Sequence, residues 1–292
     1  MRIIALVLCG FLIVGSAVPT SAWGFEAHRF VLDKAIGLLP PEIRPFFEKY
    51  RVAIVEHSID PDLWRTVEWD AQEGPRHYLD LDYYGPHPFT ALPREYDAAV
   101  KKYGADVVKQ NGLIPWRTQE MYQKLVEAFA QKQTYSRENI KLFSSVVGHY
   151  LSDAQVPFHA TLNHDGQLTA QWGIHSRFEL ELFERYRDKL RVAPQPARRI
   201  ANVRDFVFDS LTTSFTHVKT VLDADKVAAA GRDVYDDGYY AIMFEKLQPV
   251  LENRLNESIT AVASVIVSAW EEAGKLPLPA DQPRVPRKIR RQ

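Results

Sequence analysis

One twelve-residue stretch of the sequence places histidine and aspartate at a spacing that suits metal binding. It runs from Gly148 to His159 and reads GHYLSDAQVPFH. His149 and Asp153 are four residues apart, so on a helix their side chains project from one face and can reach the same ion. Pro157 is expected to end this helix, and the turn that follows would let His159 turn back toward the same region.

A second histidine–carboxylate pair repeats this spacing. His175 and Glu179 are again four residues apart, in GIHSRFELE. One such pair is often a structural accident, but two pairs and His159 fall within 31 residues. Imidazole and carboxylate ligands without thiolate suit zinc, and manganese or iron is also compatible with them. The spacing therefore predicts a metal-binding region.

Residues nearer the amino terminus offer further ligands. His28 lies in WGFEAHRF and His77 in PRHYLDLD, and the segment HSIDPDLWR between them contains Asp60 and Asp62. Either aspartate could complete a set with His77 and the pair around residue 150. The choice between the two aspartates stays open on these grounds alone.

Residues 1–22 are predicted to be a secretory signal peptide. Arg2 precedes an apolar run from Ile3 to Val14, and small residues follow as far as Ala22. The run is shorter than the about 20 residues that span a bilayer. We therefore predict cleavage between Ala22 and Trp23, a secreted or periplasmic protein, and no transmembrane anchor.

Cleavage at this position would also create a metal ligand. The α-amine of Trp23 and its own carbonyl oxygen can close a five-membered chelate on an ion. Because the pKa of such an amine is about 8, a cation can bind it in the deprotonated form at neutral pH.

The remaining pattern is helical, as the positioning of these side chains requires. Tyr122, Leu125 and Phe129 recur at spacings of three and four, and so do apolar residues between Ile140 and Leu151, with Ser136 as the expected N-cap. Further helical periodicity covers residues 28–39, 174–190, 203–222, 233–247 and 250–273. Together these patterns predict a single all-α domain with many helices.

Two other kinds of segment complete this prediction. The apolar run from Ile259 to Trp270 is interrupted by three hydroxyl side chains, which indicates a buried core helix rather than a membrane span; these are Thr260, Ser264 and Ser268. Residues 83–94 and 159–173 are rich in helix breakers and are predicted to be loops that help build a site.

Composition supports one large folded body. The chain has 292 residues, 46% of them hydrophobic, and a net charge of -1, which argues against a highly basic packaging protein and an acidic disordered chain. Its one cysteine, Cys9, lies in the predicted leader. The mature protein would therefore depend on its core, on bound metal, or on both.

The carboxyl terminus differs from the rest of the chain. Residues 276–292 contain four prolines, five basic residues and one acid, and are predicted to be a flexible basic tail. The tail could attract anionic surfaces or act only as a solubilising end. We therefore divide the chain into a leader at 1–22, a helical body at 23–275 and a tail at 276–292. The body carries 30 basic and 36 acidic residues, which suits a site that holds cations.

These residues resemble the superfamily of zinc-dependent phospholipases C and single-strand-specific zinc nucleases. The resemblance lies in the Trp23 that would begin the mature chain, in H-x3-D-x5-H at residues 149–159, and in the later H-x3-E at 175–179. It implies an all-α hydrolase with three Zn²⁺ ions in a cleft and no stable protein partner. It also implies three ligand sets: Asp62, His77, His149 and Asp153; Trp23, His28 and the shared Asp153; and His159, His175 and Glu179. The interval from Asp62 to His77 and the position of Arg65 favour Asp62 over Asp60.

This resemblance implies that metal-activated water cleaves a phosphodiester bond. In two-metal sites a pair of ions roughly 3.5–4 Å apart lowers the pKa of water and directs it at phosphorus. Asp62 is the expected proton acceptor, and Arg65 would clamp the phosphate. No covalent intermediate is needed, which agrees with the lack of a G-x-S-x-G turn.

The substrate stays open between single-stranded nucleic acid and phospholipid. The short W-x4-H start and D-x2-R resemble nuclease members, whereas Glu179 and the short interval from His159 to His175 resemble phospholipases. Four residues are candidate substrate contacts, Asp80 for a base and three aromatic residues for stacking or for packing an acyl chain: Asp80, Tyr78, Phe158 and Trp172.

The other histidines are predicted to have no part in a metal site. The histidines without a partner at metal-binding spacing are predicted to be surface or structural residues: His57, His87, His164 and His217. The adjacent His164 and Asp165 resemble a motif of other phosphohydrolases but lie in an expected turn. The alternative function is that of a non-enzymatic, metal-stabilised helical protein that binds surfaces.

Overall fold

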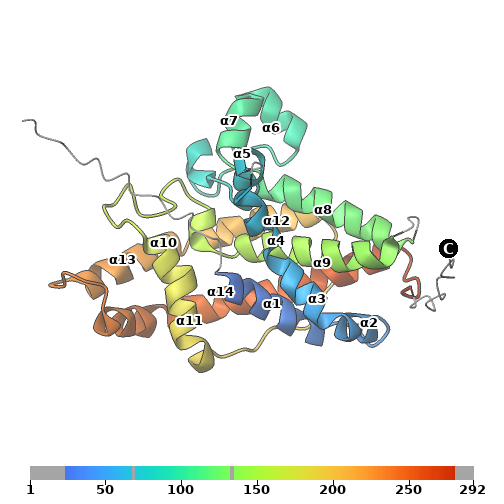
Figure 1. Cartoon of the computed structure of the whole chain (residues 1–292). Helices are drawn as coiled ribbons and strands as arrows, with labels where there is room; N and C mark the ends of the chain where they lie inside the picture. Colours follow the sequence, from blue (N-terminus) through green and yellow to red (C-terminus); the bar gives the residue numbers. More distant parts are fainter. Residues whose placement is uncertain (1–23, 68–69, 132–134, 280–292) are drawn as a thin grey trace, which may run out of the picture.

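The computed structural model describes residues 24–67, 70–131 and 135–279. All regular secondary structure in these ranges is helical, and they contain no strand (Figure 1). The predicted all-α class is therefore confirmed. The predicted leader, Trp23 and the part of the tail from residue 280 onward lie outside the described residues, and the domain boundaries stay a prediction.

The helices follow the chain in this order: α1 Phe25–Gly37, α2 Arg44–Lys49, α3 Arg51–Glu56, η1 His57–Ile59, α4 Asp60–Arg65, α5 Asp70–Glu73, η2 Gly74–His77, η3 Leu81–Tyr84, α6 Tyr96–Tyr103, α7 Ala105–Gln110, α8 Ile114–Phe129, α9 Ser136–Asp153, η4 Pro157–His159, α10 Ile174–Ser176, η5 Arg177–Glu181, α11 Leu182–Tyr186, η6 Arg187–Lys189, α12 Val203–Phe215, α13 Val218–Ala229 and α14 Asp237–Glu272. The η elements are short 3₁₀-helices except η5, which is a π-helix.

The long helices pack around α9. Helix α8 lies against α9, and α14 packs against α1, α8 and α9 (Figure 1). The buried apolar side chains form one continuous cluster. Gly148 of α9 lies where α1 and α14 approach, since a Cβ there would be 3.2 Å from Leu32 Cδ1 and 3.4 Å from Val262 Cγ1. The absence of a side chain at Gly148 thus allows α1 to pack closely beside His149.

The start of α9 differs by one residue from the prediction, which had Ser136 as the N-cap. The helix starts at Ser136 itself, with Tyr135 at the N-cap position, and ends at Asp153. Its end precedes Pro157 because residues before proline disfavour helical backbone. Pro157 then begins η4, which carries His159.

Several predicted helices have different bounds in the structure. The stretch 203–222 is divided into α12 and α13, because hydroxyls near the end of α12 bond to backbone carbonyls and compete with the helix: Thr212, Thr213 and Thr216. Conversely, 233–247 and 250–273 are one helix, α14, with Pro249 inside it. Buried Leu247 and Leu251 on either side keep packing on the core, which offsets the hydrogen bond that proline removes.

An extended segment, residues 190–200, runs along α14, and we call it the strap. Its backbone N–H groups donate at 2.7–3.0 Å to a row of polar side chains on α14: Arg191 to Glu252, Ala193 to Asn256, Gln195 to Thr260, Arg198 to Ser264 and Ile200 to Ser268. The hydroxyls that interrupt the apolar run of α14 therefore bind the strap.

Within the described ranges, no helix is both long enough and apolar enough to cross a bilayer.

Candidate metal centre

Five predicted ligands from four elements meet in the interior. They are His28 on α1, Asp62 on α4, His77 on η2, and His149 and Asp153 on α9. All five side chains are buried. The four-residue spacing along α9 places His149 and Asp153 on one face, and the packing of α1 against α9 brings His28 to them.

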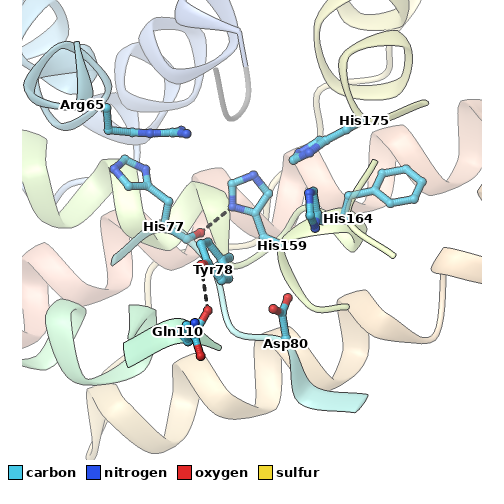
Figure 2. A pocket seen from close by; sticks show the side chains of 9 residues that line it. Arg65, His77, Tyr78, Asp80, Gln110, His159, His164 and His175 are labelled. Atoms are coloured by element: carbon cyan, nitrogen blue, oxygen red, sulfur yellow. Dashed lines mark hydrogen bonds between the residues drawn. The ribbon is translucent and has the colours of Figure 1, made fainter. Parts of the chain in front are cut away.

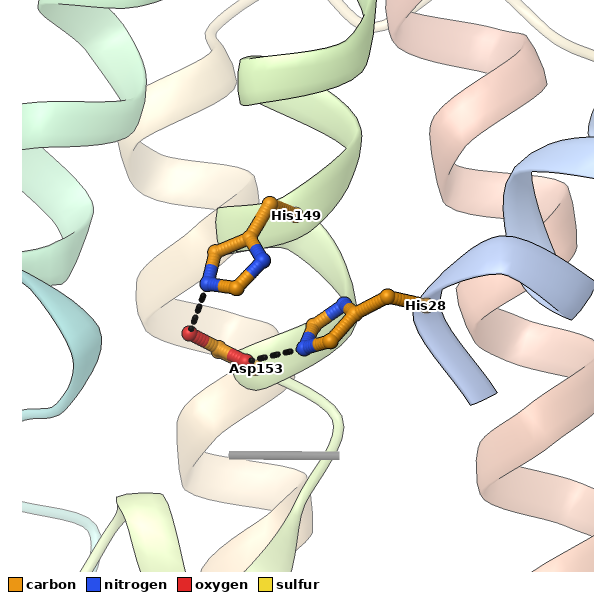
Figure 3. A group of neighbouring side chains, drawn as sticks. All are labelled: His28, His149 and Asp153. Carbon is orange, nitrogen blue, oxygen red and sulfur yellow. Dashed lines mark ion pairs between the residues drawn. The ribbon is translucent and has the colours of Figure 1, made fainter. Parts of the chain in front are cut away.

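Asp153 lies at the centre of this group and offers each oxygen to a different neighbour. Its Oδ1 is 3.3 Å from His28 Nε2, while its Oδ2 is 3.2 Å from His149 Nε2 (Figure 3). The same Oδ2 is 3.0 Å from His77 Nδ1. A carboxylate whose two oxygens face different histidines has the geometry needed to bridge two ions.

Asp62 faces the same group, whereas Asp60 does not. Asp62 Oδ1 is 3.7 Å from His77 Nδ1 and 3.9 Å from His149 Nε2, and Oδ2 is 4.0 Å from His28 Nε2. Asp60 instead lies 2.8 Å from Nδ1 of His57. Of the two alternatives left open by spacing, the structure brings Asp62 to the other ligands.

The second histidine–carboxylate pair forms a separate buried cluster with His159. Glu179 Oε2 is 3.0 Å from His175 Nε2 and 3.7 Å from His159 Nε2. Glu179 belongs to the π-helix η5 rather than to a regular α-helix. Single π-helical turns inside helices are frequent at functional sites.

The donor groups fit divalent metal ions. In each of three sets, the potential ligand atoms lie within 4.8 Å of one another. The sets are His28, His149 and Asp153; Asp62, His77 and His149; and His159, His175 and Glu179. Several buried atoms in these sets have no hydrogen-bond partner among the described residues, namely Nε2 of His28, Oδ1 of Asp153, Nε2 of His159 and Oε1 of Glu179. Buried polar atoms without partners are costly, and coordination of a cation would satisfy them.

Burial and neighbouring charge perturb the ionisation of the cluster. Burial lowers the pKa of His149, but the charges of Asp153 and Asp62 outweigh it and raise that pKa to about 9. Burial opposes ionisation of Asp153, yet the nearby histidines hold its pKa well below the usual range. The pKa of His28 and that of His77 are both lowered, chiefly by burial. Hence in the metal-free protein a proton on His149 would compete with a bound ion.

A cleft of about 320 Å³ opens beside both clusters. Figure 2 shows Arg65 and His77 on one side of the cleft and His164 and His175 on the other. Arg65 NH1 is 3.8 Å from Asp62 Oδ1. The guanidinium of Arg65 therefore lies where an anion bound near the clusters could meet it.

The predicted substrate contacts differ in their placement. Tyr78 and Asp80 line the cleft, and the Tyr78 hydroxyl donates to the Gln110 carbonyl at 3.0 Å (Figure 2). Burial and the charge of Asp82 raise the pKa of Asp80 to about 7. Phe158 also borders the cleft but is fully buried beside Phe178.

Trp172 is 66% exposed and is not among the residues that line the cleft. It therefore differs in position from the other three candidates for substrate contact.

Two residues near the clusters were not predicted from the sequence to belong to the site. His164, predicted to be only a surface or structural residue, lines the cleft beside His159 and His175. Its position in the breaker-rich segment between those histidines was the available signal. Glu73 is a buried carboxylate 3.7 Å from Nε2 of His77. Its spacing of four residues from His77 matches that of the other two pairs.

Comparisons with known proteins add little to this geometry. No protein-family model and no curated protein sequence matches the chain. Among solved structures, an alpha toxin from Clostridium absonum aligns at a TM-score of 0.47 and 14% sequence identity, over 83% of this chain. The chain spans 63% of that toxin's length.

Proposed function

We propose that the protein is a secreted zinc-dependent hydrolase that cleaves phosphodiester bonds. One observation supports this most: two groups of buried imidazoles and carboxylates border one cleft. Among the described residues that line this cleft, Arg65 is the one arginine or lysine. A cleft that can hold several cations beside an arginine suits an anionic ester.

The proposed ligands divide into three sets. One ion would be held by Asp62, His77, His149 and Asp153, a second by the amine and carbonyl of Trp23 with His28 and Asp153, and a third by His159, His175 and Glu179. When bound, zinc would supply positive charge to the phosphate and lower the pKa of water at the site.

The side chains at the cleft would divide the remaining work. Arg65 presents a planar guanidinium that can bind two phosphate oxygens at once, which would orient the ester. Asp62, whose carboxylate faces both the ligand cluster and Arg65, is the proposed acceptor of the proton released by the attacking water. Tyr78, Asp80 and Phe158 border the space that the rest of the substrate would occupy.

The substrate is proposed to be single-stranded nucleic acid or phospholipid, and one assay distinguishes these. Mature, zinc-loaded protein is incubated side by side with single-stranded DNA, RNA, phosphatidylcholine and a chromogenic phosphodiester. We expect hydrolysis of the chromogenic ester and of one natural class, lost on chelation and restored by zinc. Zinc binding that raises the melting temperature without hydrolysis of any of these esters would favour the non-enzymatic alternative.

Two aspartates on one helix provide a matched pair of variants for this proposal. Asp62→Asn is expected to lower hydrolysis by about 10²-fold or more, because a general base contributes roughly 10²–10⁴-fold. Asp60→Asn should keep most of the activity, since Asp60 pairs with His57 instead. Equal losses in both variants, measured at equal zinc content, would contradict the role assigned to Asp62.

A further inference from the structure

Glu73 is a buried carboxylate that the proposed reaction does not use. It is the last residue of α5, and only 2% of it is exposed. A buried carboxylate is costly unless other groups pair with it. Its partners therefore indicate what it does in this protein.

Three side chains hold Glu73 in one orientation. The Tyr150 hydroxyl donates to Oε1, and Arg76 NH1 donates to Oε2 at 2.6 Å. Arg117 NH2 lies 4.0 Å from Oε2, and Arg117 Nε donates to the Tyr150 hydroxyl at 3.3 Å. These contacts fix the carboxylate, and Oε1, which accepts from Tyr150, is also the oxygen that lies 3.7 Å from His77 Nε2.

The two nitrogens of His77 face different groups. Nδ1 faces the ligand cluster, 3.0 Å from Asp153 Oδ2. Nε2 is buried, has no hydrogen-bond partner among the described residues, and lies 3.7 Å from Glu73 Oε1. In a neutral imidazole one nitrogen carries the proton and the other the lone pair. A metal on Nδ1 therefore requires the proton on Nε2, opposite Glu73.

In two other proposed ligands, His149 and His159, Nε2 faces the cluster and Nδ1 bonds to an acceptor outside it. Nδ1 of His149 donates to the Ser58 carbonyl at 2.8 Å, and Nδ1 of His159 donates to the His77 carbonyl. In both residues Nε2 is the nitrogen that faces a carboxylate of the clusters. His77 alone among these three turns Nδ1 to the cluster, and its second nitrogen faces a charged acceptor rather than a backbone carbonyl.

We propose that Glu73 is a positioning residue for His77: it accepts the Nε2–H of the imidazole and thereby directs Nδ1 to the ion. This inference rests on the zinc site proposed above for His77, Asp62, His149 and Asp153. Acceptors of this kind fix the tautomer and orientation of a ligand histidine and increase its basicity. Tyr150, Arg76 and Arg117 act one step further out, by holding Glu73.

The test compares Glu73→Gln with Glu120→Gln in the full-length mature protein. Glu120 also pairs with Arg117, at 2.8 Å, but its side chain is 52% exposed and it is not a partner of His77 in the structure. Zinc affinity is measured by competition with a chelator. Glu73→Gln should weaken the zinc site that contains His77 by about 10–100-fold, as loss of such an acceptor typically does. Glu120→Gln should leave it unchanged.

Nitrogen-15 NMR of the zinc-loaded protein provides a readout that a general loss of stability would not change. The wild-type His77 is expected to show a protected Nε2–H and a metal-bound Nδ1. In Glu73→Gln the Nε2–H resonance should move upfield, because a neutral amide is a weaker acceptor than a carboxylate. Tyr150→Phe, which keeps the carboxylate and removes one of its partners, should shift the same resonance by less and serves if Glu73→Gln does not fold.

The possible outcomes separate this inference from the proposed function. A folded Glu73→Gln with wild-type zinc affinity and an unchanged Nε2–H resonance overturns the role of Glu73 while the zinc site stands. If Glu73→Gln does not fold, an unchanged Nε2–H resonance in Tyr150→Phe overturns it. Metal on Nε2 of His77 overturns it as well. A wild-type protein that binds no zinc overturns the proposed function and this inference together.

Discussion

Asp153 and His149 each favour the charged form of the other. Burial opposes charge on both groups, but each stabilises the charge of the other. In the metal-free protein the pair would remain as carboxylate and imidazolium. A cation that binds there must replace the proton on His149, so the chemistry of this pair links metal binding to pH.

Zinc affinity is therefore expected to rise with pH. Asp153 and Asp62 together raise the pKa of His149 to about 9, so protons compete with zinc below that pH and cease to compete above it. Chelator competition between about pH 6 and 9 should show tighter binding at each step and proton release on binding. An affinity that is constant or falls over this range would show that His149 holds no competing proton.

The helical elements determine which ligands can meet. Helix α9 supplies two of the proposed ligands from one face, and the glycine at 148 allows α1 to bring a third. The other cluster depends on η5, whose π-helical turn carries Glu179. Arg177 of the same turn is buried and bonds to Asp225 at 3.0 Å. The Tyr239 hydroxyl also donates to Asp225, so α13 and α14 together hold η5 in place.

Asp225→Asn is expected to loosen this turn. Removing one partner of a buried ion pair typically costs about 3–5 kcal/mol, and here it would leave Arg177 without its carboxylate. We expect a lower melting temperature and weaker metal binding by the cluster of His159, His175 and Glu179, measured by calorimetry and metal analysis. Asp223→Asn is the control on the same helix, because Asp223 pairs only with Lys219 at the surface in the described contacts. Equal effects of the two substitutions would argue against the role of Asp225.

The strap depends on side chains of α14 in a different way. Ser264→Ala removes the oxygen that accepts the backbone N–H of Arg198, so we expect a loss of about 1 kcal/mol in the free energy of unfolding. Ser144→Ala is a matched control, since the hydroxyl of Ser144 is buried without a hydrogen-bond partner among the described residues. Chemical denaturation of both variants measures the difference. A control as unstable as Ser264→Ala would show that the strap contact contributes nothing specific.

The molecule as a whole joins an apolar core to clusters of buried imidazoles and carboxylates that could hold cations. The long helices share one core, and carboxylates from α4, α9 and η5 face inward beside it. The predicted leader matters to this arrangement because its removal would expose a new amine at Trp23. Helix α1 begins at Phe25, and its His28 lies 3.3 Å from Asp153. Export, processing and assembly of the site are thus proposed to be linked.

Extending the mature amino terminus by one residue should therefore reduce hydrolysis. The extension would replace the free α-amine of Trp23 with an amide, which is a poor metal ligand. Metal analysis and the phosphodiester assay, applied to the mature and extended forms, measure the effect. Full hydrolysis by the extended protein at unchanged zinc content would rule out the chelate at Trp23.

The sequence by itself was sufficient for the local part of the site. The pairs His149–Asp153 and His175–Glu179 are read from a four-residue spacing, because a helical turn places such side chains on one face. The same reasoning predicted the all-α class. It did not reveal the continuity of α14 through Pro249, because packing on both sides of the proline outweighs its local preference.

The resemblance implied which distant residues join these pairs, but only the tertiary structure shows the contacts that bring them together. His28, Asp62 and His77 approach Asp153 because α1, α4 and η2 meet at α9, and no spacing in the chain encodes those contacts. Asp60 and Asp62 are two residues apart and chemically alike, so the rotation of one short helix separates them. Glu73 and His164 gain their positions in the same way. Contacts between residues far apart in sequence depend on the packing of the whole core, which short patterns do not specify.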